Sequence, residues 1–130
     1  MKPESVTSPE APAPVGPYSQ AIKTGCLVFV SGQLGIDPST GKLADGVEAQ
    51  ASRSLENVRA VLAASGCGMD RVVKTTILLA DMSDFKAVNA VYAGFFTSPF
   101  PARATFAVAG LPLGARVEIE AVASIERKDN

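Results

Sequence analysis

The last part of the chain, residues 116–126, alternates between apolar and mostly polar side chains with a period of two. The apolar set is Val117, Ile119, Ala121, Ala123 and Ile125, and the other set is Arg116, Glu118, Glu120, Val122 and Ser124. Successive side chains of a strand point to opposite faces of its sheet. The pattern therefore predicts a half-buried β-strand whose odd-numbered positions face a core.

A second β-like run covers residues 103–108, and a linker over residues 110–114 joins it to the alternating strand. The linker contains two glycines and a proline, the residues that turn a chain back on itself. If the two runs pair antiparallel, Arg103 shares a sheet face with Glu118 and Glu120. We therefore expect an arginine–carboxylate hairpin over residues 101–120.

Apolar periodicity predicts two helices upstream of this hairpin. The first covers residues 47–64 and ends before Gly66, a residue that commonly terminates helices. The second follows cap residues at 81–84 and is ended by the prolines of residues 98–101. Their apolar stripes are Ala51, Leu55, Val58 and Leu62 in the first, and Phe85, Val88, Tyr92 and Phe95 in the second.

The remaining strands are predicted from β-branched and apolar runs. Residues 18–23 and 26–31 form a hairpin around Thr24 and Gly25, a further short strand follows at 34–36, and residues 71–80 form a buried strand. Residues 1–14 hold four of the nine prolines, so we expect an irregular N-terminal arm. The element order predicts an α+β fold, with a mixed sheet of about six strands and two helices on one face.

Nothing in the sequence is left to cover the second face of that sheet. Self-association would cover it, although an antiparallel sheet can also leave one face solvated. The 130 residues suit a single domain. The first residues contain no apolar signal segment, and no stretch approaches the ~20 apolar residues of a membrane span. We therefore expect a cytoplasmic protein without a membrane partner.

Charge and composition exclude several classes of chemistry. The net charge is −1, which argues against a nucleic-acid partner, because phosphate backbones require a basic surface. The chain has no histidine, which removes Ser-His-Asp and Cys-His catalysis and the commonest zinc ligand. Cys26 and Cys67 are predicted to be two buried free thiols rather than a disulfide. Candidate chemistry must therefore come from carboxylates, arginine, hydroxyls and backbone amides.

Arg103 and the two glutamates are the strongest candidates. A guanidinium binds a carboxylate through two parallel hydrogen bonds, and Arg103 stands among small apolar residues where a charge needs a partner. The alternative is a structural salt bridge to Glu118 or Glu120, and the pattern alone does not decide between the two. Glu118 and Glu120 share a sheet face, where one carboxyl group with a raised pKa would shuttle protons, but the pattern favours a solvent-facing pair.

Four further residues are weaker candidates. Tyr18 offers a phenol, Ser31 a hydroxyl and Asn89 an amide, while Gly32 lets a ligand approach the backbone closely. Each of these residues alone fits a structural role at least as well.

Several motifs together resemble the Rid (reactive intermediate deaminase) family, of the RidA type. The C-terminal ones are Pro-Ala-Arg-Ala-Thr-Phe at 101–106, Leu-Pro at 111–112 and Val-Glu-Ile-Glu-Ala at 117–121. Gly-Pro-Tyr-Ser-Gln-Ala at 16–21 and Ser-Gly-Gln at 31–33 resemble the family's N-terminal motifs. Its middle is matched by Leu78, Leu79, Asp81, Met82, Phe85, Asn89 and Tyr92. The resemblance covers about residues 13–125.

The resemblance implies a chorismate-mutase-like fold and a homotrimer with clefts between its subunits. It also implies the cofactor-independent hydrolysis of 2-imino acids, such as 2-iminobutanoate and 2-iminopropanoate, or of their enamine tautomers, to 2-oxo acids and ammonia. The alternatives are a non-catalytic small-molecule-binding or chaperone-like module and, less favoured by the charge, an endoribonuclease or translation inhibitor.

The same resemblance implies a role for each candidate residue. Arg103 would clamp the substrate carboxylate, and Glu118 would activate the attacking water or pass protons to the departing nitrogen. The pocket would be lined by Tyr18, Ser31, Gly32 and Asn89. Thr105 stands where many RidA-type members have cysteine, so a hydroxyl donor replaces a thiol there.

Overall fold

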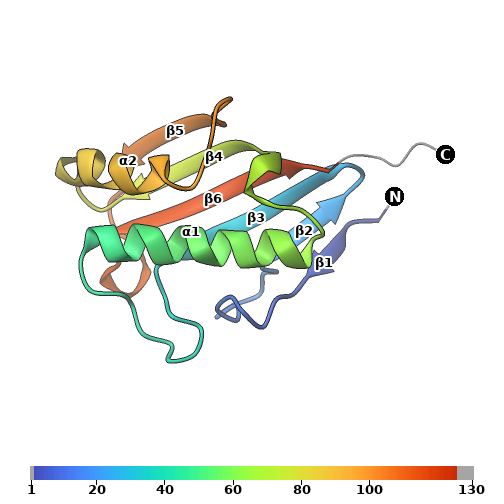
Figure 1. Cartoon of the computed structure of the whole chain (residues 1–130). Helices are drawn as coiled ribbons and strands as arrows, with labels where there is room; N and C mark the ends of the chain where they lie inside the picture. Colours follow the sequence, from blue (N-terminus) through green and yellow to red (C-terminus); the bar gives the residue numbers. More distant parts are fainter. Residues whose placement is uncertain (1, 126–130) are drawn as a thin grey trace.

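The computed structural model describes residues 2–125, which form a six-stranded sheet with two helices on one of its faces (Figure 1). The elements are β1 (Glu4–Val6), β2 (Ala21–Thr24), β3 (Leu27–Leu34), α1 (Val47–Ala64), β4 (Val72–Leu79), α2 (Phe85–Ala93), β5 (Ala102–Ala107) and β6 (Val117–Ser124). The strand order is β1-β2-β3-β6-β4-β5. The sheet is mixed, as predicted, because β4 and β5 are parallel whereas the other neighbours are antiparallel.

Both helices occupy the predicted positions, and α1 has the predicted bounds. The chain leaves α1 through Gly66, whose φ of 89° lies in the left-handed region that glycine adopts without steric cost. In α2, Val88 and Tyr92 are buried as predicted, whereas Phe85 is half-buried and packs against the edge of the core. Phe95, the last residue of the predicted stripe, lies beyond the end of α2 at Ala93 and is also half-buried against the core. Neither helix combines the length and apolarity needed to cross a bilayer, within residues 2–125.

The core lies between the sheet and the two helices. The odd-numbered positions of β6 from Val117 to Ala123 are buried, which confirms the predicted alternation, and α1 packs across β3 and β6. The opposite face of the sheet carries no helix (Figure 1). Phe29 and Phe106 lie there, 45% and 47% exposed, so the predicted uncovered face is present and partly apolar.

The predicted hairpin between the last two strands is wrong. β6 pairs with β3 and β4, while β5 pairs with β4 at the edge of the sheet. The reason is that β4, α2 and β5 form a parallel crossover, which leaves the place beside β3 to β6. The linker does turn the chain, through a short 3₁₀ turn at Pro112–Gly114 in which Leu113 and Gly114 have φ values of 60° and 67°. It carries the chain past β4 rather than back along β5.

Two smaller strand predictions also need correction. The arm is not irregular throughout, because β1 pairs antiparallel with β2 despite the neighbouring prolines, which an edge strand tolerates. The separate strand expected at 34–36 is absent from the described residues, since β3 continues past a bulge between Val30 and Gln33 as far as Leu34. Cys26 and Cys67 are free thiols, as predicted, but neither is buried: Cys26 is exposed at the turn between β2 and β3, and Cys67 is half-buried after α1.

Candidate functional site

Arg103 lies on the edge strand β5, beneath α2. It pairs in register with Thr75 of β4, which is buried on the helix-covered face, so Arg103 projects toward the helices. Its guanidinium carbon lies 5.0 Å from the centroid of the Tyr92 ring and 5.7 Å from that of Phe85. Asn89 lies between these two residues on α2 and lines, with Arg103, a hollow of about 260 Å³. The structure therefore brings Arg103 and Asn89 together.

Among residues 2–125, Arg103 makes no ion pair with a carboxylate. Aromatic ring faces stabilise its charge instead, through the attraction of a cation to the negative face of a ring. A salt bridge to Glu118 or Glu120, the alternative left open by the sequence, is wrong for the single chain, because both glutamates lie on the opposite face of the sheet. The N–H donors of Arg103 are left for a ligand.

Glu118 lies on the uncovered face, against the backbone of β3. A Cβ atom placed at Gly32 would lie 2.8 Å from Cδ and 3.0 Å from Oε2 of Glu118, so a side chain there would require the Glu118 carboxyl to move. Gly32 sits in the β3 bulge between Val30 and Gln33. The sequence predicted close approach of a ligand at this glycine, whereas the structure shows close approach of the glutamate itself.

Burial raises the pKa of the Glu118 carboxyl, and the negative charge of Glu120 raises it further. Glu120 is exposed two residues along the same face of β6. Both effects disfavour the charged form, burial by removing water and Glu120 by repulsion between like charges. A carboxyl group whose pKa is raised is better suited to accepting and returning protons than one with the ordinary pKa.

Glu118, Gly32 and Tyr18 line one pocket of about 390 Å³. Most of its other walls are apolar and come from the N-terminal arm, the end of β3 and the linker before β6: Pro12, Ala13, Val15, Leu34, Ile36, Pro112 and Leu113. Tyr18 is 50% exposed at this pocket, and its hydroxyl accepts a 3.4 Å hydrogen bond from the backbone N–H of Val15.

Ser31 and Thr105 have different surroundings. The Ser31 hydroxyl donates to the carbonyl oxygen of Ser19 at 2.6 Å, and Ser31 lines a shallow depression of the uncovered face rather than the Glu118 pocket. Thr105 lies two residues after Arg103 on the same face, and its buried Oγ1 has no hydrogen-bond partner among residues 2–125. A binding role for Ser31 or Thr105 stays a prediction.

The candidate residues thus form two groups on opposite faces of the sheet. We call Arg103 and Asn89, with the rings of Phe85 and Tyr92, the arginine half-site. Glu118, Gly32 and Tyr18 form the glutamate half-site. The sequence predicted Phe85 and Tyr92 as core residues and as part of the matching middle motif, but not as part of the site. Their spacing with Asn89 places all three along one side of α2.

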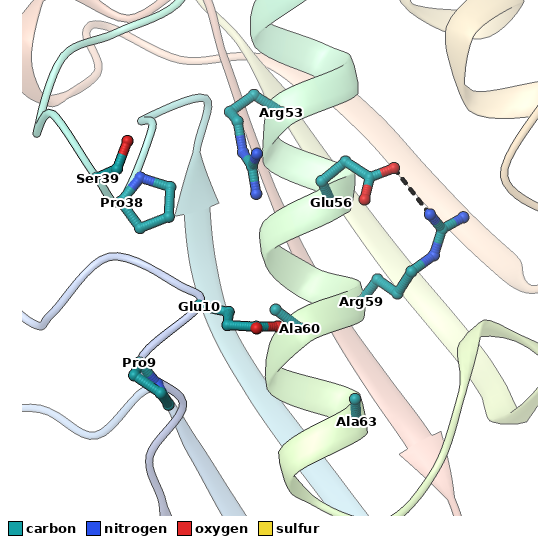
Figure 2. Close-up of a pocket in the computed structure, with 9 residues that line it drawn as sticks. All are labelled: Pro9, Glu10, Pro38, Ser39, Arg53, Glu56, Arg59, Ala60 and Ala63. Carbon is teal, nitrogen blue, oxygen red and sulfur yellow. Dashed lines mark hydrogen bonds and ion pairs between the residues drawn. The ribbon is translucent and has the colours of Figure 1, made fainter.

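A larger hollow of about 550 Å³ lies between the N-terminal arm, the turn at Pro38 and the outer side of α1 (Figure 2). Its two arginines are already engaged. Nε and Nη2 of Arg53 donate to Oδ1 of Asn57, and Arg59 pairs with Glu56 at 2.8 Å, away from Arg53 (Figure 2). Among residues 2–125, no three Cys, Asp or Glu side chains are grouped so that they could hold a metal ion. The two half-sites are therefore the stronger candidates.

Comparison with known proteins shows extensive similarity. A family model described as Endoribonuclease L-PSP matches residues 8–125. The chain is 54% identical over 124 residues to a RutC family protein of Sinorhizobium fredii, covering 94% of this chain and 98% of that one. It is 50% identical over 119 residues to a mouse protein named 2-iminobutanoate/2-iminopropanoate deaminase, covering 91% and 88%.

The fold of the chain is also similar to that of solved structures. The crystal structure of RidA from an Antarctic Psychrobacter species superposes with a TM-score of 0.92 at 45% identity, covering 94% of this chain and 99% of that one.

Proposed function

The chain belongs to the Endoribonuclease L-PSP family, as a relative of the reactive intermediate deaminases, and from this premise we propose that it is a 2-imino acid deaminase. It hydrolyses 2-iminobutanoate, 2-iminopropanoate or their enamine tautomers to 2-oxo acids and ammonia. The observation that carries the proposal is Arg103, a cation held beside aromatic rings with no carboxylate of residues 2–125 as its partner. A 2-imino acid supplies that carboxylate.

Arg103 binds and orients the substrate. Its planar guanidinium meets both carboxylate oxygens, which fixes the plane of the adjacent C=N bond. Asn89, which lines the same hollow, and the Thr105 hydroxyl, whose oxygen has no hydrogen-bond partner among residues 2–125, would add hydrogen bonds around the carboxylate. Holding the electrophilic carbon in one orientation contributes to the rate because the attacking water then meets a fixed target.

Glu118 moves the protons. A protonated imine is already an electrophile, so water adds to C2 as Glu118 removes one of its protons, giving a tetrahedral carbinolamine. The carboxyl then gives that proton to nitrogen and the C–N bond breaks, releasing ammonia, while the carbinolamine hydroxyl loses its proton to the Glu118 carboxylate and the C2–O bond becomes a carbonyl. Transfer of this last proton to the departing ammonia gives ammonium and restores Glu118 for the next turnover. A carboxyl with a raised pKa suits both steps. These steps need only the named side chains and one water.

The two half-sites meet when a second copy covers the uncovered face. We propose a homotrimer of chorismate-mutase-like architecture with clefts between subunits, in which one subunit supplies Arg103 and its neighbour Glu118. Support comes from the positions of these residues on opposite faces of one sheet and from the exposed apolar residues of the uncovered face. A cytoplasmic location belongs to the same proposal. Native mass spectrometry at micromolar concentration is expected to give three times the chain mass, and a monomer would exclude the shared cleft.

The name of the matching family describes an endoribonuclease, but the charge of this chain argues against RNA as its substrate. Twelve Lys and Arg are balanced by 13 Asp and Glu. Among residues 2–125, Arg59 pairs with Glu56 and Arg116 pairs with Asp84. Binding to a phosphate backbone depends on unpaired positive charge along a surface. A non-catalytic binding module, the other alternative, predicts ligand binding without turnover.

The proposed function is tested by turnover. 2-Iminobutanoate is generated in situ, and its loss and the appearance of 2-oxobutanoate are followed with and without the protein. We expect the protein to accelerate both, and the Arg59→Ala variant to match the wild type, because an exposed ion pair contributes little to stability. If the wild type leaves the rate of imine loss unchanged, the deaminase proposal fails.

Substitution of Gly32 tests the packing around Glu118. Gly32→Ala places a methyl group where the Glu118 carboxyl lies, so the carboxyl must move. We expect kcat/KM for 2-iminobutanoate to fall about 10- to 100-fold, because the misplaced carboxyl stabilises the transition state about 1–3 kcal/mol less well. Gly110→Ala is the matched control, since a Cβ there meets no atom within 4 Å. A folded Gly32→Ala variant with wild-type kcat/KM would show that the position of Glu118 is unimportant.

A further inference from the structure

Arg103 is held by rings rather than by an acidic partner. Its guanidinium carbon lies within 6 Å of two ring centroids, Tyr92 at 5.0 Å and Phe85 at 5.7 Å, the range of cation–π attraction. An acidic partner would occupy the N–H donors and neutralise the charge. A ring face attracts the charge and leaves the N–H donors available to a ligand.

Tyr92 is itself fixed from two directions. Its hydroxyl oxygen lies 2.7 Å from Oγ1 of Thr75, with which it shares a hydrogen bond, and its ring packs on Phe96 at a centroid distance of 4.6 Å. Thr75 is 1% exposed and pairs in register with Arg103 on the neighbouring strand. The same pair of strands therefore fixes both the backbone of Arg103 and, through Thr75, the ring against which its guanidinium rests.

We propose that Tyr92 is a positioning residue for carboxylate binding, which it promotes by holding the Arg103 guanidinium in a single orientation through its Thr75-anchored ring. Tyr92 acts through Arg103. This inference rests on the proposed function for the identity of the ligand, a 2-imino or 2-oxo acid. A purely structural Tyr92 would matter for the stability of the fold and not for the affinity of the carboxylate.

The test measures binding without turnover. The dissociation constant of 2-oxobutanoate is determined by calorimetry for the intact oligomer of the wild type and three variants, together with their thermal stability and their kcat and KM. Tyr92→Leu removes the ring. Tyr92→Phe keeps the ring and loses only the bond to Thr75. Val88→Ala is the matched control, because Val88 is 1% exposed on the same helix and its truncation lowers stability without removing a ring.

We expect Tyr92→Leu to weaken 2-oxobutanoate binding about 10-fold, within the range of a desolvated cation–π contact, with KM rising in parallel and kcat little changed. Tyr92→Phe is expected to recover most of this loss, and Val88→Ala to bind as the wild type does. Unchanged binding in Tyr92→Leu, or equal losses in Tyr92→Leu and Val88→Ala, would overturn the proposal. If the wild type binds 2-oxobutanoate and Tyr92→Leu weakens it but no imine is hydrolysed, the positioning role stands and the proposed function falls.

Discussion

Arg103→Ala is expected to lower kcat/KM for 2-iminobutanoate about 10²- to 4 × 10³-fold. The substitution removes the cation of the arginine half-site and leaves the substrate carboxylate without its bidentate partner. Loss of one partner of a desolvated charge pair costs about 3–5 kcal/mol, and each 1.4 kcal/mol is about tenfold in rate. Steady-state kinetics with imine generated in situ measures the effect.

Arg103→Lys separates charge from geometry in the same assay. Lysine keeps the positive charge but has neither the planar fork nor the delocalised cation that rests on the Tyr92 and Phe85 rings. We expect an activity between those of the wild type and Arg103→Ala, and we expect most of the difference from the wild type to be a higher KM. Arg59→Ala controls for the loss of an arginine elsewhere. Full activity in Arg103→Ala would show that Arg103 does not bind the substrate carboxylate.

Glu118→Gln is expected to lower kcat about 10²- to 10⁴-fold with a much smaller change in KM. The amide has nearly the shape of the carboxyl but neither accepts nor returns the proton of the attacking water, a contribution of this size for general acid–base catalysis. Glu120→Gln is the matched control, because Glu120 lies exposed on the same face of the same strand. Equal losses in the two variants would show that charge on this face, rather than proton transfer by Glu118, supports the reaction.

The same substitution has a predicted effect on stability. The pKa of Glu118 is raised in the folded chain, so the folded state holds its proton more tightly than the unfolded state. Stability therefore falls as the pH rises from the unfolded pKa through the folded one. Glu118→Gln removes this loss, so we expect a higher Tm than the wild type at neutral pH and a difference that shrinks toward acid pH. Thermal unfolding at several pH values measures it, and a lower Tm at neutral pH would contradict the assigned pKa direction.

The local spacing of apolar residues was sufficient to predict most of the secondary structure. The spacing of Ala51, Leu55, Val58 and Leu62 has one explanation, a helix buried on one side, and α1 has the expected bounds. The alternation of β6 likewise determined which of its side chains are buried. These features depend on residues close together in the chain, so a single sequence contains the necessary information.

Strand order and the faces of the candidate residues were harder to predict. The run at 102–107 has small residues on both of its faces, so nothing local indicates which face Arg103 occupies. We predicted an antiparallel hairpin with β6 because the linker is short. The observed strand order is instead set by the crossover through α2. The resemblance to the deaminase family named Arg103, Glu118 and Asn89 but did not indicate that the first two lie on opposite faces.

We propose that Arg103 and Glu118 act on one substrate from two different subunits. Arg103→Ala and Glu118→Gln chains, each purified and then unfolded and refolded together in equal amounts, test it directly. In a randomly mixed cyclic trimer about a quarter of the shared clefts receive both wild-type residues, so we expect about a quarter of wild-type activity from two nearly inactive proteins. A refolded mixture no more active than its separate components, with trimers present, would show that Arg103 and Glu118 do not act together across subunits.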